Sequence, residues 1–264
     1  MNCKDYKDQE KVLIIDYSLK IIEIAEGITK ESEISPADIE LINLLVSSGD
    51  ASEEIKFAAV DTIAKAANTN HVVGHDTITA LNQSLSSADT TKTVLDHTIR
   101  TLGFIVKNQN LPTSTLTLLE TYLEGDKFNN LVPVVFNLML KSGKTLSEAI
   151  IIKLAKALEN PKAKAEIKPF ICETLAEVFI GFKSNIALPD EAVESLITIS
   201  KDTSLTNSIR INAMIAYSYA RTTIETTRLA KNAIFEIVKE SFDNSNEELN
   251  NVAVEIYQTI FENI

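Results

Sequence analysis

The chain has 264 residues, of which 45% are hydrophobic and 23% are charged, the composition of a folded protein rather than a disordered one. Its seven Gly and six Pro are few for a β-rich chain of this length, so the composition favours an all-α fold. The net charge of −12 argues against binding to nucleic acid or to an anionic membrane, because both need clustered cations.

Acidic residues are concentrated at the two ends of the chain. Residues 1–71 carry 7 cations and 14 anions (−7), residues 72–188 carry 12 and 11 (+1), and residues 189–264 carry 6 and 12 (−6). Such charge steers a basic partner toward a protein, but it also keeps a protein soluble without any partner. Both interpretations stay open.

The first residues, MNCKDYKDQEKVLIIDYSLKII, do not resemble a signal peptide, because acids precede a short amphipathic segment and no small-residue cleavage site follows. We expect one helix over residues 4–25. No apolar run approaches the roughly 20 residues of a membrane-spanning helix. The two cysteines, Cys3 and Cys172, form no metal-binding motif and are expected to be unpaired thiols in a reducing compartment. A cytoplasmic location is therefore predicted.

A short motif recurs along the chain. I-K-x-x-A at residues 55–59 matches I-R-x-x-A at residues 209–213, and looser copies lie between and after them. Pro133 and Pro169 fall at the same position of the motif, in the first turn of a helix, where Pro is tolerated. The copies begin at residues 55, 94, 131, 167, 209 and 249, with steps of 39, 37, 36, 42 and 40 and a mean of 38.8.

Another helix is predicted before each copy of the motif, marked by a pair of residues four apart that are apolar in nearly every repeat. Polar segments such as SSGDAS and KDTSLTNS follow these pairs and supply helix N-caps. The pattern predicts about thirteen helices in one domain, 1–264, with a capping helix in 1–33 and six antiparallel helix pairs in 34–264. Stacked pairs bury the apolar stripe that one pair leaves exposed. The marker pairs are Ile42/Val46, Leu81/Leu85, Leu119/Leu123, Leu154/Leu158, Leu196/Ser200 and Val238/Phe242.

Helix pairs of this length, whose second helix opens I-[KR]-x-x-A, resemble the HEAT repeat, with the armadillo repeat as a near relative. The resemblance implies an α-solenoid, a right-handed superhelix whose second helices line the concave surface. It also implies a ladder between repeats, formed by an acid in the turn and a cation in the second helix. The candidate pairs are Asp50 with Lys56 and Asp202 with Arg210, whereas the other repeats keep this pattern less well.

The columns of the second helices separate a core from a candidate binding face. Counted from the first residue of the motif, positions 5 and 8 are apolar in all six repeats and are predicted to be core. Positions 3, 6 and 10 share another face, which is mostly polar but carries aromatic residues of the kind enriched at interfaces. The resemblance makes this face the floor of a protein-binding groove, and a plain solvated helix face is the alternative. The candidate residues are Asp61, Lys65, His97, Arg100, Phe104, Asn137, Lys141, Glu173, Glu177, Asn212, Tyr219 and Glu255.

The sequence offers little catalytic or metal-binding chemistry. His71 and His75 lie four apart, but Gly74 between them breaks the helix that a two-histidine zinc site needs. His97 follows Asp96, yet no Ser or Cys nucleophile can be assigned to it, and no phosphate-binding loop or G-x-S-x-G motif occurs. We therefore expect no catalytic residue, no metal and no cofactor.

Five lysines, at positions 153, 156, 162, 164 and 168, interleave with glutamates. They fit either local ion pairs or a docking patch for an acidic peptide.

These patterns predict a non-enzymatic scaffold or adaptor that binds another protein or peptide, and neither nucleic acid nor membrane. A basic partner is one candidate, because the ends of the chain are acidic. The alternative is a structural fragment or subunit of a larger helical-repeat assembly. That alternative is favoured by the apolar end YQTIFENI, which lacks the polar cap of a terminal repeat and offers a surface for self-association. An enzyme built on a helical-repeat scaffold is the least favoured interpretation.

Overall fold

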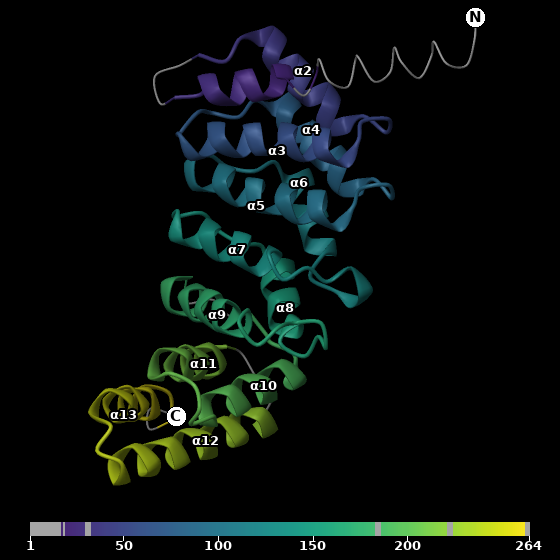
Figure 1. Cartoon of the computed structure of the whole chain (residues 1–264). Coiled ribbons are helices and arrows are strands. Elements are labelled where there is room, and N and C mark those ends of the chain that lie inside the picture. The colour runs from purple at the N-terminus through teal and green to yellow at the C-terminus, as the bar shows by residue number, and fades with distance from the viewer. Residues whose placement is uncertain (1–16, 18, 30–32, 183–185, 221–223, 262–264) are drawn as a thin grey trace, which may run out of the picture. The chain divides into compact units, whose positions relative to one another are not determined.

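A computed structural model describes residues 17, 19–29, 33–182, 186–220 and 224–261. Every regular element in these ranges is a helix: the twelve α-helices α2 to α13, one short 3-10 helix, and a helical stretch over residues 19–27 (Figure 1). The prediction of an all-α fold is confirmed. The helix expected over residues 4–25 lies mostly outside the described residues, and residues 19–25 of it are helical.

The chain groups into two compact units, Met1–Leu119 and Glu120–Ile264. The first unit contains α2 (Pro36–Ser47), α3 (Glu53–Asn68), α4 (His75–Ser86), α5 (Lys92–Asn108) and most of α6 (Thr113–Thr121). The second contains η1 (Gly125–Lys127), α7 (Val132–Lys141), α8 (Glu148–Ala157), α9 (Lys168–Phe182), α10 (Asp190–Lys201), α11 (Asn207–Tyr219), α12 (Ile224–Asp243) and α13 (Glu247–Phe261). The expectation of one uninterrupted domain stays a prediction.

The helix boundaries follow from local chemistry. Four helices begin with a Ser or Thr whose hydroxyl accepts a hydrogen bond from a backbone N–H three residues later, which satisfies a donor that the helix leaves unpaired. The predicted polar breaks supply two of these caps, and Pro133 lies in the first turn of α7 as expected. The capping residues are Ser35, Ser52, Thr91 and Ser147.

Within each unit, the second helices of successive pairs pack on one another, and so do the first helices. The two helices of a pair also pack together. The second helices form the contacts α3 with α5 in the first unit, and α7 with α9, α9 with α11 and α11 with α13 in the second. The first helices do the same, with α2 on α4, α8 on α10 and α10 on α12. Positions repeated at the period of the sequence therefore come side by side.

The core coincides with the predicted columns. Position 5 of the second helices is fully buried in the first five repeats, where it holds Val60, Ile99, Phe136, Cys172 and Met214. Position 8 is also buried there, whereas Val254 and Tyr257 of the last repeat are only half-buried. These columns are the apolar stripes that stacking removes from water.

The marker pair of α12, the first helix of the sixth pair, does not lie on the buried face of that helix. Val238 is half-buried and Phe242 is 76% exposed, whereas Ile234, Ile237 and Ser241 of α12 are buried. The inward face of this 20-residue helix is rotated by one position, about 100°, from the register that the sequence pattern favoured. Packing against α10 and α13 decides which of two possible apolar stripes faces inward.

The ladder between repeats also differs from the expected one. Arg210 is 3% exposed and pairs with Glu240 of α12, whereas Asp202 accepts hydrogen bonds from the backbone N–H and hydroxyl of Ser204. Arg210 does link consecutive repeats, but its acid lies thirty residues later in the chain. Lys56 is buried and forms no ion pair with any residue that the structure describes.

Side-chain amides also form hydrogen bonds between successive helix pairs, as the predicted ladder was expected to do. Gln109 donates to the carbonyl oxygen of Val73 at 2.9 Å and accepts from its N–H at 2.8 Å. Asn207 and Asn246 exchange two hydrogen bonds of 3.0 Å. These contacts join residues 36 and 39 apart, close to the period of the repeat, and they satisfy polar groups where turns meet.

Candidate functional site

In the first unit, the predicted face is built around an Asp61–His97 contact. The His97 Nε2 atom of α5 lies 3.1 Å from Asp61 Oδ1 of α3, and its ring stacks on Phe57 with the centroids 4.3 Å apart. Burial lowers the pKa of His97, the Asp61 carboxylate opposes this shift and the Arg100 guanidinium adds to it. The lowered pKa favours the neutral form of His97, in which the tautomer with Nε2–H can donate to the Asp61 carboxylate.

The other candidates of the first unit remain accessible. Lys65 is exposed, and its ammonium group donates to the backbone carbonyl oxygen of Ala25. Arg100 is exposed, and Phe104 is half-buried with the Lys107 ammonium 5.3 Å from its ring centroid. Together they form a strip with exposed cations beside one exposed carboxylate, that of Asp61.

In the second unit, the structure brings four of the predicted residues into one cluster across α7 and α9. Asn137 is buried and donates hydrogen bonds of 3.1 Å to Glu173 Oε2 and Thr174 Oγ1. Lys141 Nζ lies 2.9 Å from Glu173 Oε1. Glu173 thus accepts from both α7 residues, one through each oxygen.

Glu177 completes this cluster one turn after Glu173. Burial raises the pKa of Glu177, the Glu173 carboxylate raises it further, and the Lys141 ammonium lowers it. One cation therefore serves two half-buried carboxylates on the same helix face. The cluster retains an excess of negative charge that a further cation would relieve.

The three remaining candidates lie on the last two second helices. Asn212 is half-buried, Tyr219 is 40% exposed and Glu255 is exposed. The helices that carry them, α11 and α13, pack together. No hydrogen bond or ion pair links these three side chains to one another within the described part of the chain.

Two partners of the candidate face were missed by the sequence analysis. Phe57 was assigned to no column, yet its ring covers His97, and Thr174 hydrogen-bonds Asn137. Both lie next to a column position, at position 2 and position 7 of the motif. Their contacts depend on how far neighbouring second helices are shifted along their axes, and the sequence pattern does not give this shift.

Two lysines of the cluster form ion pairs with acids from an earlier segment of the chain. Lys153 lies 2.9 Å from Glu120 and 3.4 Å from Glu124, and the hydrogen bond with Glu120 raises the pKa of Lys153. Lys162 pairs with Asp126 at 2.8 Å. The acids that pair with these two lysines lie in residues 120–126 and not among the interleaved glutamates, so the ion pairs are long-range rather than local, while Lys156 and Lys164 are exposed.

Two further features bear on the kind of site that the protein offers. His71 Nδ1 lies 2.9 Å from the Thr69 hydroxyl, and His75 is an exposed first residue of α4. The described residues contain no group of three or more His, Cys, Asp or Glu side chains arranged to hold a metal ion. Within the same ranges, no helix is both long and apolar enough to span a membrane.

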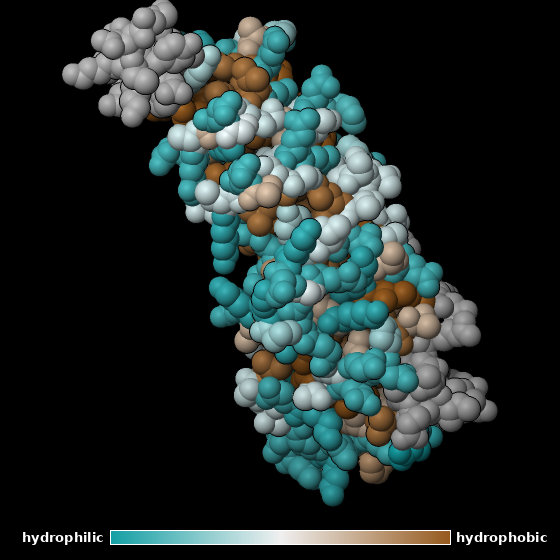
Figure 2. Space-filling view, turned by 90° about the vertical axis from the view of Figure 1, so that its right-hand side faces the viewer, coloured by the Kyte–Doolittle hydropathy of each residue, from teal (hydrophilic) through white to brown (hydrophobic). Residues whose placement is uncertain are grey.

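The face shown in Figure 2 is mostly hydrophilic, with hydrophobic residues in separate small groups.

Comparison with known proteins does not assign a family. No family model matches the chain, and no curated protein matches it. A solved structure of an engineered protein from the Northeast Structural Genomics Consortium is similar, with 16% identity over 84% of this chain and 96% of that chain and a TM-score of 0.47.

Proposed function

We propose that the chain is an α-solenoid of HEAT-like repeats that binds another protein or peptide through the exposed faces of its second helices. The observation that carries the proposal is the cluster of Asn137, Lys141, Glu173 and Glu177. Packing of α7 on α9 gathers Lys141, Glu173 and Glu177 at one surface, whereas Asn137, predicted to lie on this face, is buried beneath them and holds Glu173 by a hydrogen bond.

The charge of the cluster favours a basic partner. Glu173 and Glu177 share a single cation, and the pKa of Glu177 is raised by burial and by its neighbour. A Lys or Arg side chain from a partner would lie between the two carboxylates and stabilise their charged forms. Residues 189–264 carry a further charge of −6, which would attract the same partner over a longer distance.

The proposal is tested by affinity capture from a cell extract of the source organism, followed by mass spectrometry. The wild-type chain is compared with a triple variant, Glu173→Lys, Glu177→Lys and Glu255→Lys. A control with Glu148→Lys, Glu159→Lys and Glu166→Lys makes the same change in net charge at exposed positions outside the second-helix face. The expected result is a protein that wild type and control recover and the first variant loses. Equal recovery by all three would refute the proposed surface.

A second candidate function, as a subunit of a larger helical assembly, is favoured by one surface of α12. Phe235 is 62% exposed and Phe242 is 76% exposed, and residues seven apart lie on the same side of a helix. Exposed aromatic residues at this spacing are typical of surfaces covered by another protein. Self-association through this surface is tested by gel filtration at two protein concentrations. The control is the double variant Phe235→Ser/Phe242→Ser. A concentration-dependent dimer that the double variant abolishes would support self-association.

A further inference from the structure

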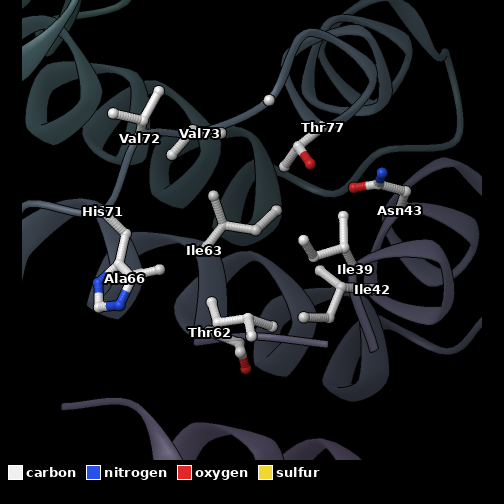
Figure 3. Close-up of a pocket in the computed structure, with 12 residues that line it drawn as sticks. Ile39, Ile42, Asn43, Thr62, Ile63, Ala66, His71, Val72, Val73 and Thr77 are labelled. Carbon is white, nitrogen blue, oxygen red and sulfur yellow. The ribbon is translucent and has the colours of Figure 1, made fainter. Parts of the chain in front are cut away.

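A pocket opens in the first unit, on the side of the first helices. It lies between α2, α3 and the loop that leads into α4, and it encloses about 390 Å³ of open space including its mouth (Figure 3). Its walls are mainly aliphatic, formed by Ile34, Ile39, Ile42, Ile63 and Val73. Val72 also lines the pocket, although 82% of its surface is exposed.

One polar atom in this pocket has no partner. The side-chain oxygen of Asn43 is buried and accepts no hydrogen bond, and Figure 3 shows the Asn43 amide at the edge of the cavity near Thr77. Leaving such an acceptor without a donor costs free energy, so an occupant that supplies a donor is favoured over one that does not.

The next helix pair carries the equivalent two residues, and there they are hydrogen-bonded to each other. Asn82 follows Asn43 by 39 residues and Thr115 follows Thr77 by 38, so the two pairs are equivalent in the repeat. The Asn82 Nδ2 atom donates to the Thr115 hydroxyl at 2.9 Å and joins α4 to α6, while the buried Asn82 Oδ1, like that of Asn43, accepts no hydrogen bond from the described residues. No hydrogen bond joins Asn43 to Thr77, although both are among the residues that the structure describes, and here the pocket is open.

The groove continues from the pocket along the outer sides of α2 and α4. A shallower depression, lined by Leu44, Ser47, Thr79 and Gln83, shares Asn43 with the pocket. Glu40 and Asp76 line this depression and are both exposed. Of the described residues that line the pocket and the depression, none is Lys or Arg.

These features select a chain rather than a free small molecule. A pocket that continues into an open depression with carboxylates at its rim suits a peptide with a cation. The aliphatic pocket with one buried acceptor suits a flat apolar ring that ends in a hydroxyl donor. Tyrosine has this donor at the tip of its ring, so it reaches a buried acceptor while its backbone stays in the groove.

We propose that the α2–α4 groove binds a basic peptide segment, with a tyrosine ring in the aliphatic pocket, its hydroxyl donating to Asn43, and a neighbouring Lys or Arg against Glu40 and Asp76. This surface is separate from the second-helix face, so either proposal can fail without the other.

The test uses methyl-labelled full-length protein and nuclear magnetic resonance titration with the capped peptide Gly-Lys-Tyr-Lys-Gly. The expected result is saturable shifts of the Ile39, Ile42, Val72 and Val73 methyl signals at millimolar peptide. The analogue with Phe in place of Tyr should bind about tenfold more weakly, because it leaves the Asn43 oxygen without a donor.

Matched variants separate the pocket from general effects on the fold. Asn43→Leu should abolish the preference for Tyr over Phe, and the equivalent Asn82→Leu should retain it. Glu40→Gln/Asp76→Asn should weaken binding of the lysine peptide but not of the same peptide with Gln for Lys. Thermal unfolding of each variant shows whether it remains folded.

Three outcomes would overturn the proposal. They are the absence of shifts at these methyl signals, equal affinity of the Tyr and Phe peptides for the wild-type protein, and N-acetyltyrosinamide binding as tightly as the peptide. The last result would show that the pocket takes a free phenolic ligand and that the groove contributes nothing.

Discussion

Arg210 of α11 donates two hydrogen bonds to Glu240 of α12, one from each terminal nitrogen, at 3.1 and 2.7 Å. Its Nε donates a third, of 2.8 Å, to the carbonyl oxygen of Ser200. The guanidinium is almost fully buried, whereas the Glu240 side chain keeps 30% of its exposure. One side chain thus joins α10, α11 and α12, and it does so with the planar geometry that only Arg provides.

Removal of Glu240 should destabilise the protein strongly. Glu240→Ala leaves a buried guanidinium without its counter-ion, and we expect a loss of about 2–3 kcal/mol in the free energy of unfolding. The double variant Arg210→Met/Glu240→Leu removes the charge together with its partner and should lie within about 1 kcal/mol of wild type. Urea denaturation followed by circular dichroism measures both. A single variant as stable as the double one would show that the pair does not matter.

Phe242 tests the corrected register of α12, and the buried Phe136 of α7 serves as the reference. Phe136 is fully buried in α7, so Phe136→Ala should cost about 3–5 kcal/mol through lost burial and a residual cavity. Phe242 is 76% exposed, and Phe242→Ala should change stability by less than about 0.5 kcal/mol. Equal losses in thermal or urea unfolding would mean that Phe242 is a core residue after all.

The two equivalent asparagines should respond differently to the same substitution. Both side-chain oxygens lack a donor, but Asn82→Leu also removes a hydrogen bond to the buried Thr115 hydroxyl and should cost about 1–2 kcal/mol. Asn43→Leu removes an acceptor that has no partner, so stability should stay within about 0.5 kcal/mol of wild type or rise. Chemical denaturation of the two variants side by side makes the comparison, and the reverse order would contradict the structure.

His97 should titrate below the ordinary histidine range. Its pKa is lowered chiefly by burial, and Asp61 opposes this shift, so Asp61→Asn should lower the pKa further while Arg100→Gln should raise it. The unfolded chain then binds a proton at a higher pH than the folded one, and the stability contributed by neutral His97 is lost as pH falls from about 6.5 through the folded pKa. Proton resonances of the ring, followed against pH in each variant, give the order directly. A pKa above 6.5 in the wild type would contradict it.

Cys172 should be inert in the folded protein. Burial raises the pKa of its thiol to about 12, and only the thiolate reacts with alkylating reagents. In a Cys3→Ser background, iodoacetamide at pH 8 should modify Cys172 more than about 100-fold faster in urea than in the native state. Mass spectrometry of timed samples measures the two rates, and comparable rates would place the thiol at the surface.

The helical fold was predictable because the signals that create it are local. The motif at residues 55–59 and its five copies mark the first turns of α3, α5, α7, α9, α11 and α13 to within two residues. Capping residues such as Ser52 and Thr91 lie in the polar breaks that the sequence indicated. Helix propensity, capping and the 3.6-residue period all act within one or two turns, so they can be read without knowledge of tertiary contacts.

The candidate face was predictable only in part. The columns correctly brought Asn137 and Lys141 of α7 to Glu173 and Glu177 of α9, because both helices keep the same register from their first turn. They did not reveal that Phe57 covers His97. That contact depends on the offset between neighbouring helices, which side-chain volumes in the core determine.

The amino-acid sequence by itself determined the helices, their boundaries and the apolar columns, since each follows from residues a few positions apart. Only the tertiary structure decided the partners over longer distances: Glu240 rather than Asp202 for Arg210, the inward face of α12, and the Thr115 partner of Asn82 where the equivalent Asn43 borders an open pocket. In each case two alternatives satisfy the local pattern equally. The close packing of helices thirty to forty residues apart in the sequence then selects one of them.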